Sequence, residues 1–227
     1  MILLGIETAT PVCGVALGRE DAILVERSLN VGTHHVERLL PMVRDALAEA
    51  GLGLRDLDGI AVSIGPGSFT GLRIGLSTAK SLCWSAGLPL VAVPTLEAMA
   101  AQFPYAACPV CPALDARKKE VYAALYDTSS GEPGVLTAPA AVLPVPFVAS
   151  LAGPVLFVGD GARLYRREIV AALGEAARFA PAPLDRASAA AVAALGLSRL
   201  VRGETEDLAG VEPIYLRKSE AELKHGG

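Results

Sequence analysis

Residues 65–75 read Gly-Pro-Gly-Ser-Phe-Thr-Gly-Leu-Arg-Ile-Gly, and this stretch decides the fold class. The apolar run 60–64 precedes it like a buried strand, and residues 72–86 follow it with helical spacing and no breaker. The glycines and the proline break the strand, and Ser68 or Thr70 stands where a helix N-cap belongs. The stretch therefore predicts a strand, a tight loop and a helix whose positive end and N–H groups suit an anion.

Neither common nucleotide-binding motif fits this loop. A Walker loop ends in Gly-Lys-Ser or Gly-Lys-Thr, whereas Gly71 is followed by Leu72. A dinucleotide fingerprint has the spacing G-x-G-x-x-G, but Gly65, Gly67 and Gly71 lie one residue too far apart. Two interpretations stay open: a loop that binds an anion, and a structural turn whose glycines permit a close approach of the backbone.

The composition predicts a folded, soluble protein. The chain has 227 residues, of which 52% are hydrophobic and 19% charged, which is enough for one large α/β domain or two small lobes. A formal net charge of −4 makes the chain by itself a poor electrostatic partner for nucleic acid. Glu7 interrupts the opening apolar run, so we expect no signal peptide, and no apolar run is long enough to span a membrane. We expect a cytoplasmic protein.

Short strands and amphipathic helices alternate along the chain, as in α/β proteins. The expected strands are 2–6, 13–18, 22–27, 60–64, 90–94, 108–114, 120–126 and 155–158, and the expected helices are 33–50, 72–86, 95–100, 163–173 and 187–203. Because this rhythm recurs, we predict two α/β lobes, residues 1–104 and residues 105–227, although no clean sequence repeat accompanies it. Residues 129–154, rich in Pro, Gly and Ala, are expected to be the least structured. Pro41 either bends its helix or marks a late start.

The chain contains no complete set of catalytic residues. Its three histidines are His34, His35 and His225, and the first two are adjacent, which prevents the i, i+4 pairing of two metal ligands on one helix face. We expect this pair to meet solvent or an interface at the start of a helix, and His225 to lie in a frayed terminus. No serine has the G-x-S-x-G surroundings of a hydrolase nucleophile.

Two cysteines and three carboxylates remain as candidates for chemistry. Cys108 and Cys111 have the spacing of half a zinc site, but no second pair accompanies them, so we expect buried, reduced thiols and no metal. Glu7, Asp115 and Asp160 each follow an expected strand, where α/β proteins place functional groups. Each could equally cap a helix or a turn, and both interpretations stay open.

Several segments, in order along the chain, resemble the TsaB (YeaZ) family, bacterial partner proteins in threonylcarbamoyladenosine modification of tRNA. The glycine motif 65–75 is the most specific of them. The others are Ile6-Glu7-Thr8-Ala9-Thr10, His35–Met42, Thr95–Ala98, Asp115-Ala-Arg117 with Glu120-Val-Tyr122, Gly159-Asp-Gly161 and Pro213-Ile-Tyr-Leu-Arg217. The resemblance covers nearly the whole chain. It implies the two-lobed actin/Hsp70/sugar-kinase (ASKHA) fold, an α/β fold in which each lobe is a mixed sheet flanked by helices.

The resemblance also implies that this chain does not perform the transfer itself. The related transferase TsaD carries two metal-binding histidines as His-x-x-x-His, where this chain reads Thr95-Leu-Glu-Ala-Met99. Neither an alcohol nor a thioether replaces imidazole at such a site. The first phosphate loop of the superfamily normally carries Asp, and Glu7 at that place weakens the case for autonomous Mg-ATP binding. We therefore expect no catalytic residue, no metal and no firmly bound cofactor, with ATP and Mg²⁺ bound only in a complex with partners.

Two sets of candidate site residues remain. The candidate nucleotide or ligand contacts are Glu7, Thr8, Gly65, Gly67, Ser68, Asp115, Arg117, Gly159 and Asp160. The candidate partner interface lies on apolar faces of the two helices of the first lobe and comprises Leu39, Met42, Val43, Ala46, Phe69, Leu72, Leu76, Ala79 and Cys83. Burial of these helix faces inside one domain is the alternative.

The resemblance implies a non-catalytic scaffold subunit in the synthesis of threonylcarbamoyladenosine at tRNA position 37. Such a subunit would dimerise with a TsaD-like protein, act with a TsaE-like ATPase and reach tRNA only through the complex. In isolation we expect a homodimer, and we expect no membrane contact. The alternative is a stand-alone enzyme, either an ATP-dependent sugar-kinase-like phosphotransferase or a protease. The missing histidine pair, the altered phosphate loop and the absent nucleophile favour the scaffold.

Overall fold

The protein forms two compact units in the computed structural model. The residues that this structure describes are 1–30, 32 and 35–217. The first unit comprises Met1–Ala98 and Ala187–Ile214, and the second comprises Met99–Arg186 together with the chain from Tyr215 onward. Each unit contains one five-stranded sheet. Among the described helices, none has the length and apolar character needed to cross a membrane.

The elements of the first sheet and its helices follow the predicted order. They are β1 (Ile2–Glu7), β2 (Val12–Arg19), β3 (Ala22–Asn30), α1 (His35–Ala50), β4 (Gly59–Ser63), α2 (Phe69–Ala86), β5 (Leu90–Val93), α3 (Thr95–Ala100) and α7 (Ala189–Val201), with a 3₁₀ turn at Leu54–Asp56. The strand order is β3-β2-β1-β4-β5. Strands β1, β2 and β3 pair antiparallel, whereas β4 and β5 extend the sheet in parallel.

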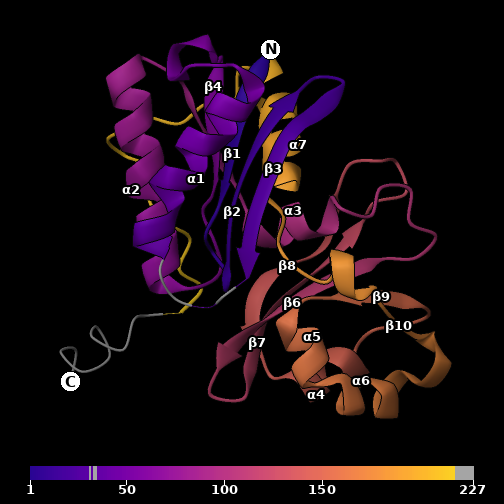
Figure 1. Ribbon diagram of the computed structural model, residues 1–227. Coiled ribbons are helices and arrows are strands. Elements are labelled where there is room, and N and C mark those ends of the chain that lie inside the picture. The colour runs from indigo at the N-terminus through magenta and orange to yellow at the C-terminus, as the bar shows by residue number, and fades with distance from the viewer. Residues whose placement is uncertain (31, 33–34, 218–227) are drawn as a thin grey trace, which may run out of the picture. The chain divides into compact units, whose positions relative to one another are not determined.

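The side chains of β1 alternate between two cores, one on each face of the sheet. Leu4 and Ile6 pack with residues of α1 and α2, whereas Leu3 packs with residues of α7. This alternation follows from the two-residue period of a strand. Figure 1 shows α1 and α2 side by side over one face of this sheet and α7 over the other. Both faces are covered, which explains why β1, β2 and β4 are apolar except at their last residues.

Helix α7 approaches the first sheet closely because both surfaces carry small residues. A Cβ added to Gly5 of β1 would collide with the backbone of Ala189, and one added to Gly196 of α7 would collide with Ala61 of β4. Helix α7 therefore belongs to the first unit. The expected second lobe, residues 105–227, differs from the structure in this segment, since an alanine-rich helix packs best against glycine positions in a sheet, wherever they lie in the sequence.

The second unit contains more regular structure than the composition indicates. Its elements are β6 (Val110–Arg117), β7 (Glu120–Asp127), β8 (Gly134–Val142), α4 (Pro144–Ala149), β9 (Val155–Val158), α5 (Asp160–Leu164), α6 (Arg166–Leu173) and β10 (Ala177–Phe179), with 3₁₀ turns at Gly174–Ala176 and Ala182–Leu184. The expectation of little structure in 129–154 is wrong, because β8 and α4 lie there. Strand β8 forms through antiparallel pairing with β7, and Pro139 is tolerated because β8 is an edge strand.

The two units repeat one topology. The order of the second sheet, β10-β9-β6-β7-β8, corresponds strand for strand to that of the first. In each unit the first three strands form an antiparallel meander, the fourth strand pairs with the first in parallel, and the fifth pairs with the fourth in parallel. The duplication expected from the rhythm of the sequence is thus present in the fold. As a consequence, the loop after β4 and the loop after β9 occupy equivalent places, and so do the β1–β2 and β6–β7 connections.

Candidate functional site

The glycine motif forms a tight loop after β4 and the start of α2, as predicted. Ser68, rather than Thr70, is the N-cap, since its Oγ accepts a hydrogen bond from the N–H of Gly71 at 3.2 Å. The N–H of Ser68 donates to the carbonyl oxygen of Ala9 at 2.7 Å. A backbone N–H that an anion would need therefore already has an internal partner.

The glycines of this motif lie directly against the loop that follows β1. A Cβ at Gly67 would collide with the carbonyl oxygen of Ala9, and one at Gly71 with that of Thr8. A Cβ at Gly75 would collide with the hydroxyl of Thr8, which donates to the carbonyl of Gly71 at 2.8 Å. The glycines thus let two segments of the chain pack backbone to backbone. Of the two interpretations left open by the sequence, the contacts favour the structural turn.

Glu7 ends β1 and is completely buried. Its Oε1 accepts a hydrogen bond from the N–H of Ala9 at 2.7 Å, whereas its Oε2 has no hydrogen-bond partner within the described part of the chain. Burial raises the pKa of Glu7 to about 7, against the opposing effect of hydrogen bonds from Ser63 and two backbone N–H groups. A carboxyl group that holds its proton up to neutral pH is a weak Mg²⁺ ligand, because Mg²⁺ binds the ionised form.

The loop after β9 repeats this arrangement in the second unit. Gly159, with φ +107°, and Gly161 both lie against the backbone of β6, where an added Cβ would collide with main-chain atoms. The N–H of Gly159 donates to the carboxylate of Asp185, and Oδ1 of Asp160 accepts from the N–H of Asp115 at 3.1 Å. In both units, therefore, a glycine loop after the fourth strand packs against the backbone of the first strand or of the loop that directly follows it.

Asp115 and Arg117 bind each other at the end of β6. The N–H of Arg117 donates to Oδ1 of Asp115 at 2.8 Å, and its guanidinium lies 3.0 Å from Oδ2. The side chain of Asp115 is 17% exposed and that of Arg117 is 86% exposed, so the carboxylate is fixed at the base of the turn while the guanidinium lies in solvent. Arg217 donates to the carbonyl of Ala116 at 3.1 Å and lies 3.3 Å from the carboxylate of Glu120. The segments 115–122 and 213–217, both of which resemble the family, are thus joined at the β6–β7 hairpin.

Thr95 and Met99, the positions at which the resemblance places the histidine pair of the transferase, are both completely buried. The hydroxyl of Thr95 accepts a hydrogen bond from the N–H of Gly65 at 3.1 Å, and the N–H of Thr95 donates to the Gly65 carbonyl at 2.8 Å. The Met99 side chain lies beside Gly159. Both side chains therefore serve packing, and the described residues contain no cluster of three or more His, Cys, Asp or Glu side chains that could hold a metal ion.

Most residues expected at the partner interface are instead part of the interior of the first unit. Those that are buried are Leu39, Met42, Val43, Ala46, Leu72, Leu76, Ala79 and Cys83. Of the nine expected residues, Phe69 alone is exposed, at 36%. The expectation is wrong for the buried ones because a regular i, i+3, i+4 apolar stripe marks the side of a helix that faces its own sheet.

A different face of α1 and α2 carries apolar side chains into solvent. Val36 is 69% exposed, Leu40 is 53% exposed and Trp84 is 83% exposed. Val36 and Leu40 lie one turn apart on α1, so they are neighbours on its surface. The guanidinium of Arg73 stacks 3.9 Å from the ring centroid of Phe69. We call Val36, Leu40, Phe69 and Trp84 the exposed helix face. Val36 and Leu40 have the same helical spacing as the buried Val43, so the sequence pattern alone did not separate them from the buried residues.

His35 begins α1 and is half-buried. Its Nε2 lies 3.1 Å from the carbonyl oxygens of both Thr10 and Val12, to which an Nε2–H can donate. The imidazole therefore ties the start of α1 to the β1–β2 connection, in contrast to the expected contact with solvent or an interface. His34 and His225, for which such expectations were also stated, lie outside the described residues.

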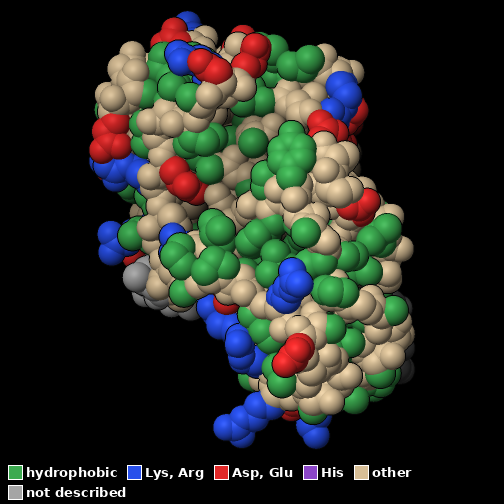
Figure 2. Space-filling model, turned by 90° about the vertical axis from the view of Figure 1, so that its right-hand side faces the viewer, with side chains coloured by type: hydrophobic (Ala, Val, Ile, Leu, Met, Phe, Trp, Pro, Cys, Tyr) green, Lys and Arg blue, Asp and Glu red, His purple; other side chains and the backbone are tan. Residues whose placement is uncertain are grey.

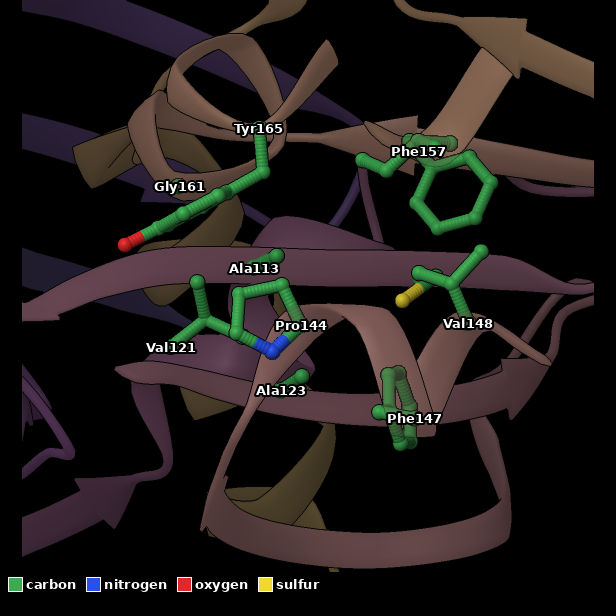
Figure 3. A pocket seen from close by; sticks show the side chains of 11 residues that line it. Ala113, Val121, Ala123, Pro144, Phe147, Val148, Phe157, Gly161 and Tyr165 are labelled. Atoms are coloured by element: carbon green, nitrogen blue, oxygen red, sulfur yellow. The ribbon is translucent and has the colours of Figure 1, made fainter. Parts of the chain in front are cut away.

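The second unit has an apolar pocket of about 250 Å³, a volume that includes its open mouth (Figure 3). Phe147, Val148 and Phe157 are among the side chains that line it. Cys111 also lines it, and burial raises the pKa of this thiol to about 12, so it stays protonated and unreactive. Figure 3 shows the hydroxyl of Tyr165 directed away from the phenylalanine rings. Among the described residues that line the pocket, none therefore places a polar side-chain group where it could act on a ligand.

The repeated sheet topology and the two glycine loops define the structural class of this protein. Two units with the same mixed sheet, each fastened by a loop after its fourth strand, are the architecture of the actin/Hsp70/sugar-kinase superfamily. The ROK hexokinase of Thermus thermophilus shares this fold, with a TM-score of 0.51 and 14% identity over 89% of this chain and 100% of that chain. At this identity the likeness concerns the fold alone.

The chain belongs to the TsaB (YeaZ) family, as its motifs indicated. It is 34% identical over 227 residues to the tRNA threonylcarbamoyladenosine biosynthesis protein TsaB of Bacillus subtilis, a match that covers 99% of this chain and 97% of the relative. The structure of YeaZ from Pseudomonas aeruginosa matches with a TM-score of 0.80 and 31% identity, over 95% of this chain and 99% of that chain. The family model of TsaD, the tRNA N6-adenosine threonylcarbamoyltransferase, matches residues 29–225.

Proposed function

We propose that this protein is a non-catalytic subunit in the synthesis of N6-threonylcarbamoyladenosine at position 37 of tRNA. In this role it binds a TsaD-like transferase, acts with a TsaE-like ATPase and works in the cytoplasm. The observation that carries the proposal is the similarity to TsaB over nearly the full length of both chains. Burial of Thr95 and Met99, where the transferase has metal ligands, supports a subunit that leaves the chemistry to its partner.

The contacts of the glycine loop and of Glu7 disfavour a stand-alone kinase. A kinase needs a loop that approaches a phosphate, but the glycines at 67, 71 and 75 approach the chain's own backbone and the Thr8 side chain. Glu7, whose pKa is about 7, is a weak ligand for the Mg²⁺ that accompanies ATP. We therefore propose that the isolated chain binds no Mg-ATP firmly, and that nucleotide binds only in the complex. Titration calorimetry of the isolated chain with Mg-ATP tests this directly, and a micromolar Kd would contradict it.

One reconstitution tests the proposed function. A TsaD-like transferase, a TsaE-like ATPase, threonylcarbamoyl-adenylate and an ANN-decoding tRNA are combined with and without this chain, and modified adenosine is quantified. We expect modification to depend on the chain. Equal modification in its absence would overturn the proposal, whereas transferase activity of the chain alone would favour the enzyme alternative.

We propose that the exposed helix face is the docking surface for the TsaD-like partner and, in isolation, for a second copy of the chain. Val36 and Leu40 are exposed neighbours on α1, and contiguous exposed apolar side chains are typical of surfaces that a partner covers. A helix pair on each partner would make a four-helix contact, and a stable contact of this kind buries about 1,500 Å² in total. Trp84, near the C-terminal end of α2, is a candidate anchor residue for such a contact, since tryptophan is enriched among binding hot spots.

Leu40→Glu is expected to weaken self-association at least tenfold, because it places a charge where an apolar contact would be desolvated. Sedimentation or light scattering at micromolar concentration measures the dissociation constant. The matched control is Leu136→Glu on β8, since Leu136 is 55% exposed and Leu40 is 53% exposed. Leu76→Glu is the contrasting variant: Leu76 is buried, so this change should unfold the first unit instead of separating intact protomers. A wild-type protein that is strictly monomeric, or an unchanged Leu40→Glu variant, would contradict the docking surface.

A further inference from the structure

The turn between β6 and β7 has a backbone conformation that its residues rarely adopt. Arg117, Lys118 and Lys119 have φ values of +62°, +51° and +67°, so three consecutive side-chain-bearing residues lie in the left-handed region. Turns of this kind usually carry glycine or asparagine, which enter that region with little strain. Here the positions are held by three cations instead. Backbone strain of this kind is concentrated at functional sites, so the three cations of this turn are candidates for a binding role.

The strained turn is braced from both sides. Asp115 accepts the N–H of Arg117 and pairs with its guanidinium, while Arg217 donates to the Ala116 carbonyl and pairs with Glu120. The carboxylates of Asp115 and Glu120, which flank the turn in sequence, thus each form an ion pair with an arginine. This bracing holds the turn in one shape, so its exposed cations are presented in a fixed geometry.

The ammonium groups of Lys118 and Lys119 are the part of the turn without partners. Both residues are exposed, and neither has an ion pair or a hydrogen bond within the described part of the chain. The backbone that carries these two lysines is already held in one conformation. Binding of an anion therefore costs less conformational entropy here than it would on a mobile loop. The pair is therefore a preorganised site for negatively charged groups spaced along a surface.

The net charge of the whole chain hides an uneven distribution between the two units. Among described residues, the first unit has 9 Lys and Arg against 14 Asp and Glu, whereas the second has 9 against 8. The acidic balance that made the chain a poor partner for nucleic acid therefore resides in the first unit. On the second unit, Figure 2 shows Lys and Arg side chains projecting into solvent. The turn 117–119 belongs to the unit in which a polyanion meets no net repulsion.

We propose that the β6–β7 turn, through Lys118 and Lys119 with Arg117, contacts the phosphate backbone of the RNA substrate. The proposal rests on the proposed function, which brings tRNA to the complex. The turn carries no apolar side chain that could enter a bilayer, since Ala116 is buried, so its chemistry fits phosphodiesters better than a membrane surface. Contacts of this type position the nucleic acid without reading its sequence.

The test uses the complex of this chain with its TsaD-like and TsaE-like partners, an ANN-decoding tRNA as probe, and the variant Lys118→Gly/Lys119→Gly. Glycine removes the charges and also relieves the left-handed strain, so we expect an equal or higher midpoint of urea unfolding together with a three- to tenfold lower tRNA affinity. The slope of log K against log salt should fall by about 1.5, as expected for two lost phosphate contacts. If Lys118 and Lys119 only shaped the turn, the glycine variant would not combine weaker tRNA binding with an unchanged or higher urea midpoint.

Two further variants complete the design. Lys118→Arg/Lys119→Arg keeps the charge and should keep the affinity and the salt slope. Arg19→Ala/Arg55→Ala removes the same charge from exposed positions of the first unit and should leave both unchanged. An unaltered affinity and slope in the glycine variant would overturn the proposal, and so would a loss confined to binding of the TsaD-like protein, which would mark the turn as a protein contact.

The two proposals can fail separately. If the wild-type chain supports modification and the glycine variant binds tRNA equally well, the turn proposal fails and the proposed function stands. If the glycine variant binds tRNA more weakly but the wild-type chain does not stimulate modification, the proposed function fails and the contact with RNA stands.

Discussion

Gly71→Ala is expected to destabilise the first unit by about 3 kcal/mol or more. The added Cβ would collide with the carbonyl oxygen of Thr8, a backbone atom that can move only if the end of β1 moves with it. The same residue accepts the hydrogen bond from the Thr8 hydroxyl, so any shift also breaks that bond. Urea denaturation, followed by circular dichroism, should show a clearly lower midpoint than that of the wild-type protein.

Two other glycines provide controls for this prediction. Gly53→Ala should change the midpoint little, because φ is −102° there and the new Cβ would lie 3.4 Å from the Asp56 carboxylate. Gly75→Ala should destabilise, but its Cβ meets a side-chain atom, the hydroxyl of Thr8, so Thr8→Ala should recover part of the loss. Thr8→Ala should not rescue Gly71→Ala, whose obstacle is main chain. A wild-type midpoint for Gly71→Ala would mean that space exists beside the loop, as an anion cradle requires.

Glu7→Gln is expected to stabilise the protein above neutral pH by about 3 kcal/mol. The pKa of Glu7 is raised from 4.5 to about 7 in the folded protein, chiefly because the carboxyl is buried. Below pH 4.5 it is protonated in both states and imposes no penalty. Between pH 4.5 and 7 the unfolded chain releases its proton first, so stability falls as pH rises, and above pH 7 the full penalty remains. The glutamine amide is always neutral and avoids this loss.

The measurement is the free energy of unfolding of both proteins between pH 4 and pH 8.5. The difference between them isolates Glu7, because every other titrating group is present in both. Glu206→Gln, which changes an exposed carboxylate of the same unit, should give a curve parallel to that of the wild-type protein. If the Glu7→Gln curve is also parallel, the buried carboxyl is not responsible for the pH dependence, and Glu7 is then ionised at neutral pH and able to bind Mg²⁺.

The predicted partner surface shows why a helical pattern identifies a buried face more readily than a docking face. The stripe through Leu76 and Ala79 is regular because it faces a regular sheet, and burial follows from the periodicity itself. Val36 and Leu40 continue the helical spacing of the buried Val43, and only the structure shows that they are uncovered. The choice between these faces depends on which side the sheet occupies, and that is set by contacts between segments far apart in sequence.

The sequence by itself determined the order of most strands and helices, the N-cap at residue 68 or 70, and the family. Each of these depends on neighbouring residues or on a motif, so local patterns are enough. Only the tertiary structure decided that α7 completes the first unit and that β8 and α4 form within 129–154. It also decided that the glycines of 65–75 face the chain's own backbone and that a buried Glu7 holds its proton near neutral pH. These properties depend on packing between distant segments and on exclusion of water, neither of which a local pattern contains.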